Sequence, residues 1–200
     1  AFDTASRLFG LSFTERHDIP VWHPDVRVWE VKDGQGAHKA LFYGDYFARP
    51  SKRSGAWMTS LRDQEKLGGD IRPVILNVCN FSKPAAGEPA LLSFEDTRTL
   101  FHEFGHGLHH MLTRVNERDV SGISGVEWDA VELPSQFMEN FCWEWSVLRH
   151  MTAHVETGEP LPRALFDKML AAKNFQSGLQ TLRQIEFALF DMRLHAEPER

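Results

Sequence analysis

Two histidines stand one helical turn apart in the run H-E-F-G-H at residues 102–106, and a glutamate directly follows the first of them. Positions i and i+4 lie on the same face of a helix, so the imidazoles of His102 and His106 can reach one metal ion. Glu103 lies about 100° round the helix, where it can reach a water on that ion without binding the ion itself. The spacing therefore predicts that this part of the chain is a helix carrying a catalytic metal site.

The residues around the motif also predict a helix. Ser93 and Asp96 have the spacing of a capping box, with Ser93 as the N-cap. His102, His106 and His109 share one face of this helix. Apolar residues recur at helical spacing on the opposite face, and they are Leu100, Phe101, Phe104, Leu108, Met111 and Leu112. We expect the apolar stripe to pack inward and the imidazoles to face a cleft or solvent.

Gly105 and Gly107 are unusual inside a helix, where each costs about 1 kcal/mol relative to alanine. One interpretation is that a strand or a bound peptide passes close over the motif. The other interpretation is tight packing against a neighbouring helix. The sequence leaves both open.

A catalytic zinc ion needs a third protein ligand besides two histidines, and it keeps one position open for water. Glu132 is a candidate, because it stands near the start of a second apolar-patterned segment. The glycine-rich run S-G-I-S-G at 121–125 allows the chain to turn before it. An exposed helix carboxylate is the alternative interpretation of Glu132. Asp129 could orient a ligating imidazole through a hydrogen bond, or it could act as an N-cap.

Residues 99–144 resemble the thimet oligopeptidase family of zinc metallopeptidases. The runs that carry the resemblance are H-E-F-G-H-G-L-H-H, S-G-I-S-G and D-A-V-E-L-P-S-Q-F-M-E-N. The similarity extends to V-W-H-P-D-V-R at 21–27, K-R-S-G-A-W-M at 52–58 and L-F-D-M-R-L-H-A-E at 189–197. It therefore covers nearly the whole chain and is far more specific than the five-residue motif.

The resemblance implies that His102, His106 and Glu132 bind one Zn²⁺ ion per chain and that Glu103 is the catalytic base. Zinc would activate a water, and Glu103 would take its proton and return it to the leaving amine. The same ligand set could also hold Co²⁺ or Mn²⁺. The candidate substrate contacts are Gly122, Gly125 and His109, and for His109 an exposed or supporting role is the alternative.

Members of this family have an elongated helical body and a deep channel that admits short peptides. They use a segment rich in His and Tyr, further along the chain, to stabilise the oxyanion, and this chain has only Tyr43 and Tyr46. We therefore expect a partial catalytic region that lacks N- and C-terminal parts of its parent. The main hypothesis is a zinc-dependent endopeptidase for short oligopeptides. A dipeptidyl carboxypeptidase of the same family and a non-catalytic zinc-binding module are the alternatives.

The overall charge and hydropathy limit the other function classes. A formal net charge of −6 argues against nucleic acid or an anionic membrane as the partner. No apolar stretch approaches the ~18 residues that a membrane-spanning helix needs. Cys79 and Cys142 are expected to be reduced packing residues rather than a disulfide. These features predict a cytoplasmic protein.

The expected fold class is mainly α with a small antiparallel sheet, an incomplete zincin-like catalytic core. We expect one partial catalytic domain over 1–200, with the sheet in 1–95 and the zinc-binding helices in 96–200. A hairpin is predicted from 26–32 and 39–47, joined by a turn at Asp33, and a second strand pair from 74–80 and 90–94. Residues 1–17 are expected to be a helix end and a loop, and further helices are predicted after Pro134, from Pro162 to about Asn174, and over 179–194. A substrate strand could pair with an exposed sheet edge, expected at 77–81 or at 41–45.

Overall fold

The computed structural model of this chain describes residues 1–196. The described chain forms two compact units, Ala1–Val147 and the residues from Leu148 onward. Glu197, which ends the last run of the family resemblance, lies outside the described residues. The prediction of a single domain over 1–200 stays a prediction.

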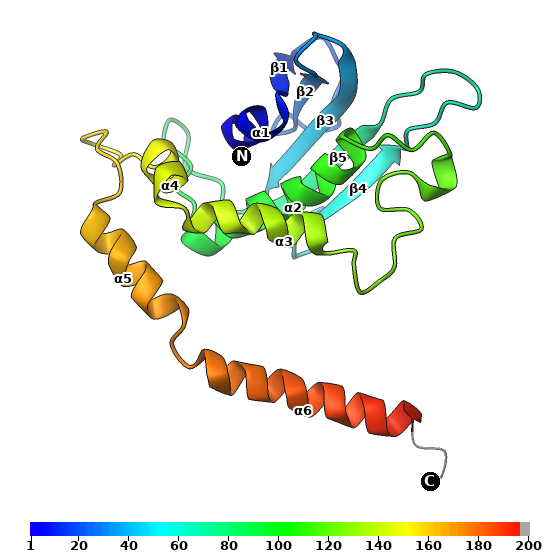
Figure 1. Cartoon of the computed structure of the whole chain (residues 1–200). Helices are drawn as coiled ribbons and strands as arrows, with labels where there is room; N and C mark the ends of the chain where they lie inside the picture. The colour runs from blue at the N-terminus through cyan, green and yellow to red at the C-terminus, as the bar shows by residue number, and fades with distance from the viewer. Residues whose placement is uncertain (197–200) are drawn as a thin grey trace. The chain divides into compact units, whose positions relative to one another are not determined.

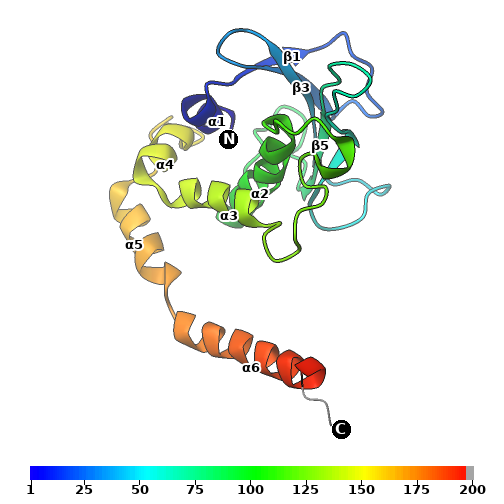
Figure 2. The same ribbon diagram turned by 45° about the vertical axis from the view of Figure 1, so that its right-hand side comes forward.

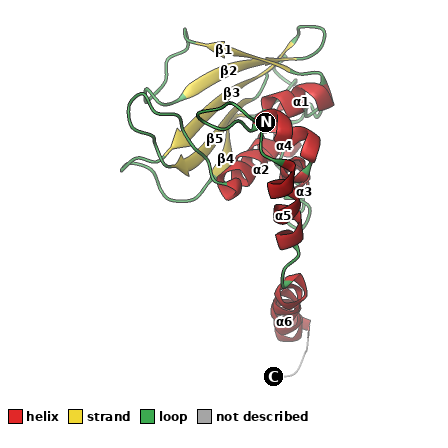
Figure 3. Cartoon of the chain, turned by 90° about the vertical axis from the view of Figure 1, so that its left-hand side faces the viewer, coloured by secondary structure: helices red, strands yellow, loops and turns green. Residues whose placement is uncertain are grey.

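The first unit is built around a five-stranded mixed sheet with strand order β1-β2-β3-β5-β4 (Figure 3). Its strands are β1 (Ser12–Arg16), β2 (Arg27–Lys32), β3 (His38–Phe47), β4 (Trp57–Arg62) and β5 (Val74–Phe81). All neighbouring pairs are antiparallel except β3 and β5, which run parallel, with Leu41 opposite Val74 and Asp45 opposite Val78. The structure agrees with the expected combination of helices with a sheet, but the expectation that this sheet is antiparallel is wrong, because β3 and β5 run parallel.

Local sequence signals predicted some of these strands and missed others. The hairpin of β2 and β3 is confirmed, with Asp33 accepting hydrogen bonds from the turn. Residues 12–16, expected to be a loop, form β1, and the edge strand β4 was not predicted. Residues 90–93 form no strand, because they are an exposed loop that ends at the N-cap of a helix. The antiparallel neighbour of β5 is β4 instead.

Helix α2 (Phe94–Met111) packs against one face of this sheet, over β5 and β4 (Figure 1). Ser93 and Asp96 form the predicted capping box, in which each side chain accepts a hydrogen bond from the other residue's backbone N–H at 3.0 Å. Such a cap contributes about 1 kcal/mol to helix stability. Phe104 of α2 meets Phe42 of β3 edge to face at a centroid distance of 5.4 Å.

The main core lies between the sheet and α2. Its largest buried members come from the predicted apolar stripe and from the inward faces of the strands, and they are Trp29, Phe42, Ile75, Phe101, Phe104, Leu108 and Met111. Helix α1 (Phe2–Phe9) closes one side of it, since Phe2 stacks on Phe13 of β1 with a centroid distance of 4.2 Å. The inward packing of the stripe is thereby confirmed.

A buried ion-pair network fixes the end of β3. Asp45 is only 3% exposed, and it accepts two hydrogen bonds from the Arg49 guanidinium, at 2.6 and 2.7 Å, and one from Lys52 at 3.1 Å. The Lys52 ammonium also donates to the backbone carbonyls of Phe47 and Cys79, so it ties the ends of β3 and β5 together. Burial opposes the ionisation of Asp45, but these hydrogen bonds outweigh it and lower its pKa to about 2.

The segment after α2 contains three short helical pieces where one amphipathic helix was predicted. They are α3 (Leu133–Glu139), the 3-10 turn η2 (Asn140–Trp143) and α4 (Trp145–Met151), and a further 3-10 turn, η1 (Arg118–Val120), precedes them. Helix α3 lies beside α2, as the turned view shows (Figure 2). Cys142 of η2 and Cys79 of β5 are both buried and free, as expected.

The predicted last two helices are confirmed as α5 (Arg163–Lys173) and α6 (Ser177–Ala196). Through residue 196, no helix is long and apolar enough to cross a membrane. The cytoplasmic location stays a prediction.

Candidate metal centre

Helix α2 brings two imidazoles to one side of the molecule. The rings of His102 and His106 lie 5.0 Å apart, centroid to centroid, and nearly perpendicular to each other. His106 is buried and His102 is partly exposed. Burial lowers the pKa of His106 and outweighs the opposing charge of Glu132, so this imidazole is neutral, the form that binds metals.

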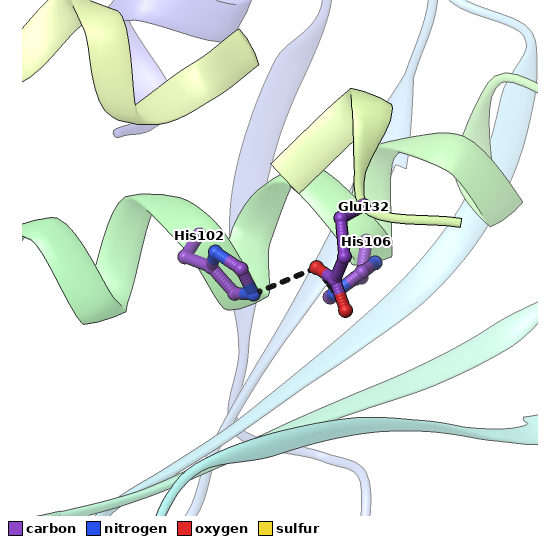
Figure 4. A group of neighbouring side chains, drawn as sticks. All are labelled: His102, His106 and Glu132. Carbon is purple, nitrogen blue, oxygen red and sulfur yellow. Dashed lines mark ion pairs between the residues drawn. The ribbon is translucent and has the colours of Figure 1, made fainter. Parts of the chain in front are cut away.

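Glu132 joins the two histidines, as predicted. It is the N-cap of α3, and its Oε2 lies 3.2 Å from Nε2 of His102 and 3.1 Å from Nε2 of His106 (Figure 4). One ligand atom from each of the three residues falls within 4.8 Å of the other two. A tetrahedral ion with ligand bonds of about 2.05 Å separates neighbouring ligand atoms by roughly 3.3 Å. The spacing of these atoms therefore suits a small ion such as zinc.

Ser135 holds the Glu132 carboxylate in place. Its hydroxyl donates to Oε2 of Glu132 at 2.7 Å and is also 2.9 Å from the backbone carbonyl of the same residue. This hydrogen bond is the main cause that lowers the pKa of Glu132, with the neighbouring histidines adding to it. Glu132 is therefore an ionised carboxylate that Ser135 holds in one orientation, rather than a free surface group.

The two glycines of α2 allow close packing on two sides. A Cβ at Gly105 would lie 2.5 Å from the carbonyl oxygen of Pro134 and 2.6 Å from Cα of Ser135, so α3 rests directly on the helix backbone. A Cβ at Gly107 would touch Asn77 and Ile75 of β5, at 3.4 and 3.5 Å. Tight helix packing thus explains Gly105, and a strand of the sheet explains Gly107.

Glu103 lies between α2 and the sheet edge and is only 7% exposed. Burial is the main cause that raises its pKa, and a backbone hydrogen bond from Met58 of β4 partly opposes the rise. A pocket of about 300 Å³ opens beside it, lined by Ala56, Glu95, Arg98, Thr99, His102, Glu103 and Glu139. Glu103 is therefore a carboxylate of increased basicity that is not part of the ligand set.

Sequence reasoning missed Glu139 and gave its role to Asp129. Oε1 of Glu139 lies 2.7 Å from Nδ1 of His102, which directs Nε2 of that ring toward Glu132. Asp129 is exposed, forms no hydrogen bond or ion pair with either histidine, and is not the N-cap of α3. The signal that could have found Glu139 is its spacing, because it follows Glu132 by two helical turns and so shares its helix face.

The predicted substrate contacts lie near the motif, and the structure gives the two glycines a backbone role. Gly122 has φ 63° and Gly125 has φ 74°, in the left-handed region that favours glycine. Gly122 also packs directly on the ring of His110, where a Cβ would overlap it. His109 is half-buried and lines a second pocket of about 330 Å³ with Gly105 and Phe137. Substrate contact by these three residues stays a prediction.

The comparison with known protein families agrees with this site. The model of peptidase family M3 matches residues 1–200, and the chain belongs to this family. The fold and the convergent His, His, Glu set thus occur in a peptidase-family chain, as the sequence resemblance predicted.

Among individual proteins, the chain is 56% identical to oligopeptidase A of Escherichia coli (strain K12) over 198 residues. It is 45% identical to the organellar oligopeptidase A of Arabidopsis thaliana over 203 residues and 48% identical to dipeptidyl carboxypeptidase of Escherichia coli over 198 residues. These matches cover 98%, 98% and 99% of this chain but 29%, 26% and 29% of the relatives. The chain therefore spans less than a third of the length of each of these relatives.

Proposed function

We propose that this chain supplies the zinc-binding part of a metallopeptidase that hydrolyses short oligopeptides. The observation that carries the proposal is the convergence of His102, His106 and Glu132 beside a buried glutamate, Glu103. Two imidazole nitrogens and one carboxylate oxygen are a common ligand set of catalytic zinc, which keeps a further position open. The names of the relatives, oligopeptidase A and dipeptidyl carboxypeptidase, point to the same substrate class.

His102, His106 and Glu132 would hold the ion. When bound, zinc supplies a Lewis acid that polarises a peptide carbonyl and lowers the pKa of a coordinated water. The same ligand set could also hold Co²⁺ or Mn²⁺, so zinc is proposed on the chemistry of the ligands and on the family.

Glu103 would move the proton. Its carboxylate takes the proton of the attacking water and later delivers it to the leaving amine, so the peptide bond breaks with no net change at Glu103. Burial supports this role in two ways. It raises the pKa of Glu103, which makes the carboxylate a stronger base, and it excludes competing water. The 300 Å³ pocket beside Glu103 and His102 is the place for the reacting part of the substrate.

The exposed sheet edge for substrate lies elsewhere than predicted. The segments 77–81 and 41–45 belong to β5 and β3, which are interior strands with neighbours on both sides. The edge strand near the site is β4, and the backbone hydrogen bond from Met58 to Glu103 brings that edge to the catalytic carboxylate. We infer that an extended substrate pairs with β4, which would set its scissile bond beside Glu103.

Neither of the two tyrosines lies where it could stabilise the oxyanion. Tyr43 stacks on Trp22 and packs in a small cluster with Val26 and Val28. Tyr46 stacks on Phe81, and its burial raises its pKa. Neither ring belongs to the ligand set or to the pocket beside Glu103.

The test is cleavage of an internally quenched oligopeptide by the zinc-loaded protein, with zinc content measured in parallel. Glu103→Gln should retain one zinc per chain and lose at least about 100-fold in kcat, since general base catalysis contributes roughly 10²–10⁴-fold. Glu117→Gln, on an exposed carboxylate, is the matched control and should cleave normally. Stoichiometric zinc without cleavage by the wild type would favour the non-catalytic module.

The identity with dipeptidyl carboxypeptidase supports a second candidate activity, removal of C-terminal dipeptides. Product analysis separates the two. Internal cleavage products, which persist when the substrate's C-terminus is amidated, support the endopeptidase, whereas dipeptide products lost on amidation support the carboxypeptidase.

A further inference from the structure

A chain of polar contacts leads away from the metal centre toward the start of α2. Nδ1 of His102 lies 2.7 Å from Oε1 of Glu139, and the other carboxylate oxygen, Oε2, accepts a hydrogen bond from Nη2 of Arg98 at 2.7 Å. Nη1 of Arg98 reaches the Glu95 carboxylate at 3.0 and 3.2 Å. Arg98 thus bridges an exposed glutamate and the glutamate that supports a ligand.

Helix geometry makes this arrangement specific. Arg98 and His102 are four residues apart on α2, so their side chains lie on one face, and Glu139 reaches both from α3. Glu139 has two oxygens and each has one partner. Its side chain is 19% exposed, so loss of the guanidinium would leave Oε2 without its charged partner in a mostly buried place.

The other ligating imidazole has no comparable support. Nδ1 of His106 is buried without a hydrogen-bond partner among the residues that the structure describes, 1–196. His102 is therefore the ligand whose tautomer and ring orientation are fixed by a carboxylate. Any group that fixes this carboxylate acts on His102.

We propose that Arg98 is a positioning residue of the metal centre, which holds Glu139 in the orientation that presents Nε2 of His102 to the ion. This inference rests on the proposed zinc site. The guanidinium donates along a fixed direction, so it selects one rotamer of Glu139, and that rotamer places Oε1 at Nδ1 of His102. The contact between Arg98 and Glu95 contributes little, because the Glu95 side chain is 74% exposed.

A purely structural role for Arg98 is the competing explanation, since the ion pair also joins α2 to α3. A double-mutant cycle tests whether Arg98 acts through Glu139, and urea unfolding of the metal-free variants measures what the ion pair contributes to stability. If Arg98 acts on the metal only through Glu139, its replacement should change zinc affinity in the wild type and should change nothing further once Glu139 is glutamine. A contribution of Arg98 that does not pass through Glu139 would persist in both backgrounds.

The experiment measures zinc affinity by competition with a chelator for wild type, Arg98→Met, Glu139→Gln and the double variant. Replacing a direct partner of a ligand typically weakens metal binding by about 10–100-fold, which we expect for Glu139→Gln. Arg98→Met should weaken binding by about 3–10-fold, and the double variant should match Glu139→Gln. Arg7→Met, which removes an exposed ion pair with Asp3 on α1, is the matched control.

The absorption spectrum of the Co²⁺-substituted protein gives a second readout, because it reports ligand geometry rather than stability. Arg98→Met should shift this spectrum and Arg7→Met should not. If Arg98→Met does not fold, Arg98→Lys replaces it, with at least a twofold loss of affinity expected. A folded Arg98 variant with wild-type affinity, or an equal loss in the Glu139→Gln background, would overturn the inference. A wild type that binds no zinc would instead overturn the proposed function.

Discussion

Gly105→Ala should separate α2 from α3, the two helices that carry the proposed metal ligands. The added Cβ would lie 2.5 Å from the carbonyl oxygen of Pro134 and 2.6 Å from Cα of Ser135. Both neighbours are backbone atoms, so no rotamer change can relieve the contact. Ordinary contact begins at 3.4 Å, so α3 must move by about 0.9 Å, the difference between 3.4 and 2.5. Metal–ligand bonds tolerate only about 0.2 Å, and Glu132 moves with α3.

The expected result has two parts. Overpacking costs about 1–3 kcal/mol, and the better helix propensity of alanine returns about 1 kcal/mol, so the metal-free protein should lose at most about 2 kcal/mol. Zinc affinity should fall further, by at least about tenfold, because the displacement exceeds the tolerance of the ligand bonds. The two quantities are measured by urea unfolding without metal and by chelator competition.

Gly178→Ala in α6 is the matched control, since a Cβ there meets nothing within 4 Å. It should leave zinc affinity unchanged. The reasoning is refuted if Gly105→Ala binds zinc as tightly as Gly178→Ala does.

Three further predictions concern other parts of the first unit. Ser135→Ala removes the 2.7 Å hydrogen bond to Glu132 and should weaken zinc binding by about tenfold in the competition assay. An unchanged zinc affinity would contradict the role given to the Ser135 hydroxyl. Asp45→Asn removes the carboxylate that pairs with Arg49 and Lys52, whose side chains are 17% and 5% exposed, and should cost about 3–5 kcal/mol in urea unfolding at pH 7. The pKa of Asp45 is about 2 in the folded protein and about 3.9 in the unfolded chain, so the wild type should lose about 2 kcal/mol of its stability over Asp45→Asn as the pH falls from 4 toward 2. A difference in unfolding free energy between the two proteins that stays constant with pH would count against the ion-pair network. Gly122→Ala should destabilise the protein by about 2–3 kcal/mol, because the added Cβ strains a left-handed backbone and overlaps the His110 ring. In a His110→Ala background the overlap is gone, so thermal unfolding should show a smaller penalty of about 1–2 kcal/mol.

Local patterns predicted the parts of the site that depend on one helix. The spacing of His102 and His106 and the capping box at Ser93 are properties of short segments, and the structure confirms their placement. The family resemblance identified Glu132, whose position depends on how α3 packs on α2. Glu139 was missed because only this packing shows which acidic side chain reaches Nδ1 of His102.

The sheet was harder to predict for the same physical reason. The turn at Asp33 predicts the hairpin of β2 and β3, because these two strands follow each other directly in the sequence. The insertion of β5 between β3 and β4 depends on pairing between distant segments, which no local pattern encodes. Strand β4 was missed because its burial does not alternate strictly, so it lacks the period of two.

The proposed ligands lie on α2 and at the N-cap of α3, whereas the backbone group that contacts Glu103 comes from β4, much earlier in the chain. Residues 112–132 connect α2 to α3, and the cost of closing such a connection grows only slowly with its length, whereas docking β4 against Glu103 requires most of the sheet to be in place. We therefore expect that, during folding, the helix pair can form the proposed ligand set before Glu103 has its final surroundings. On the proposed function, metal capture and catalytic competence are two separate events, and we expect a partly folded molecule to hold zinc without acting on peptides.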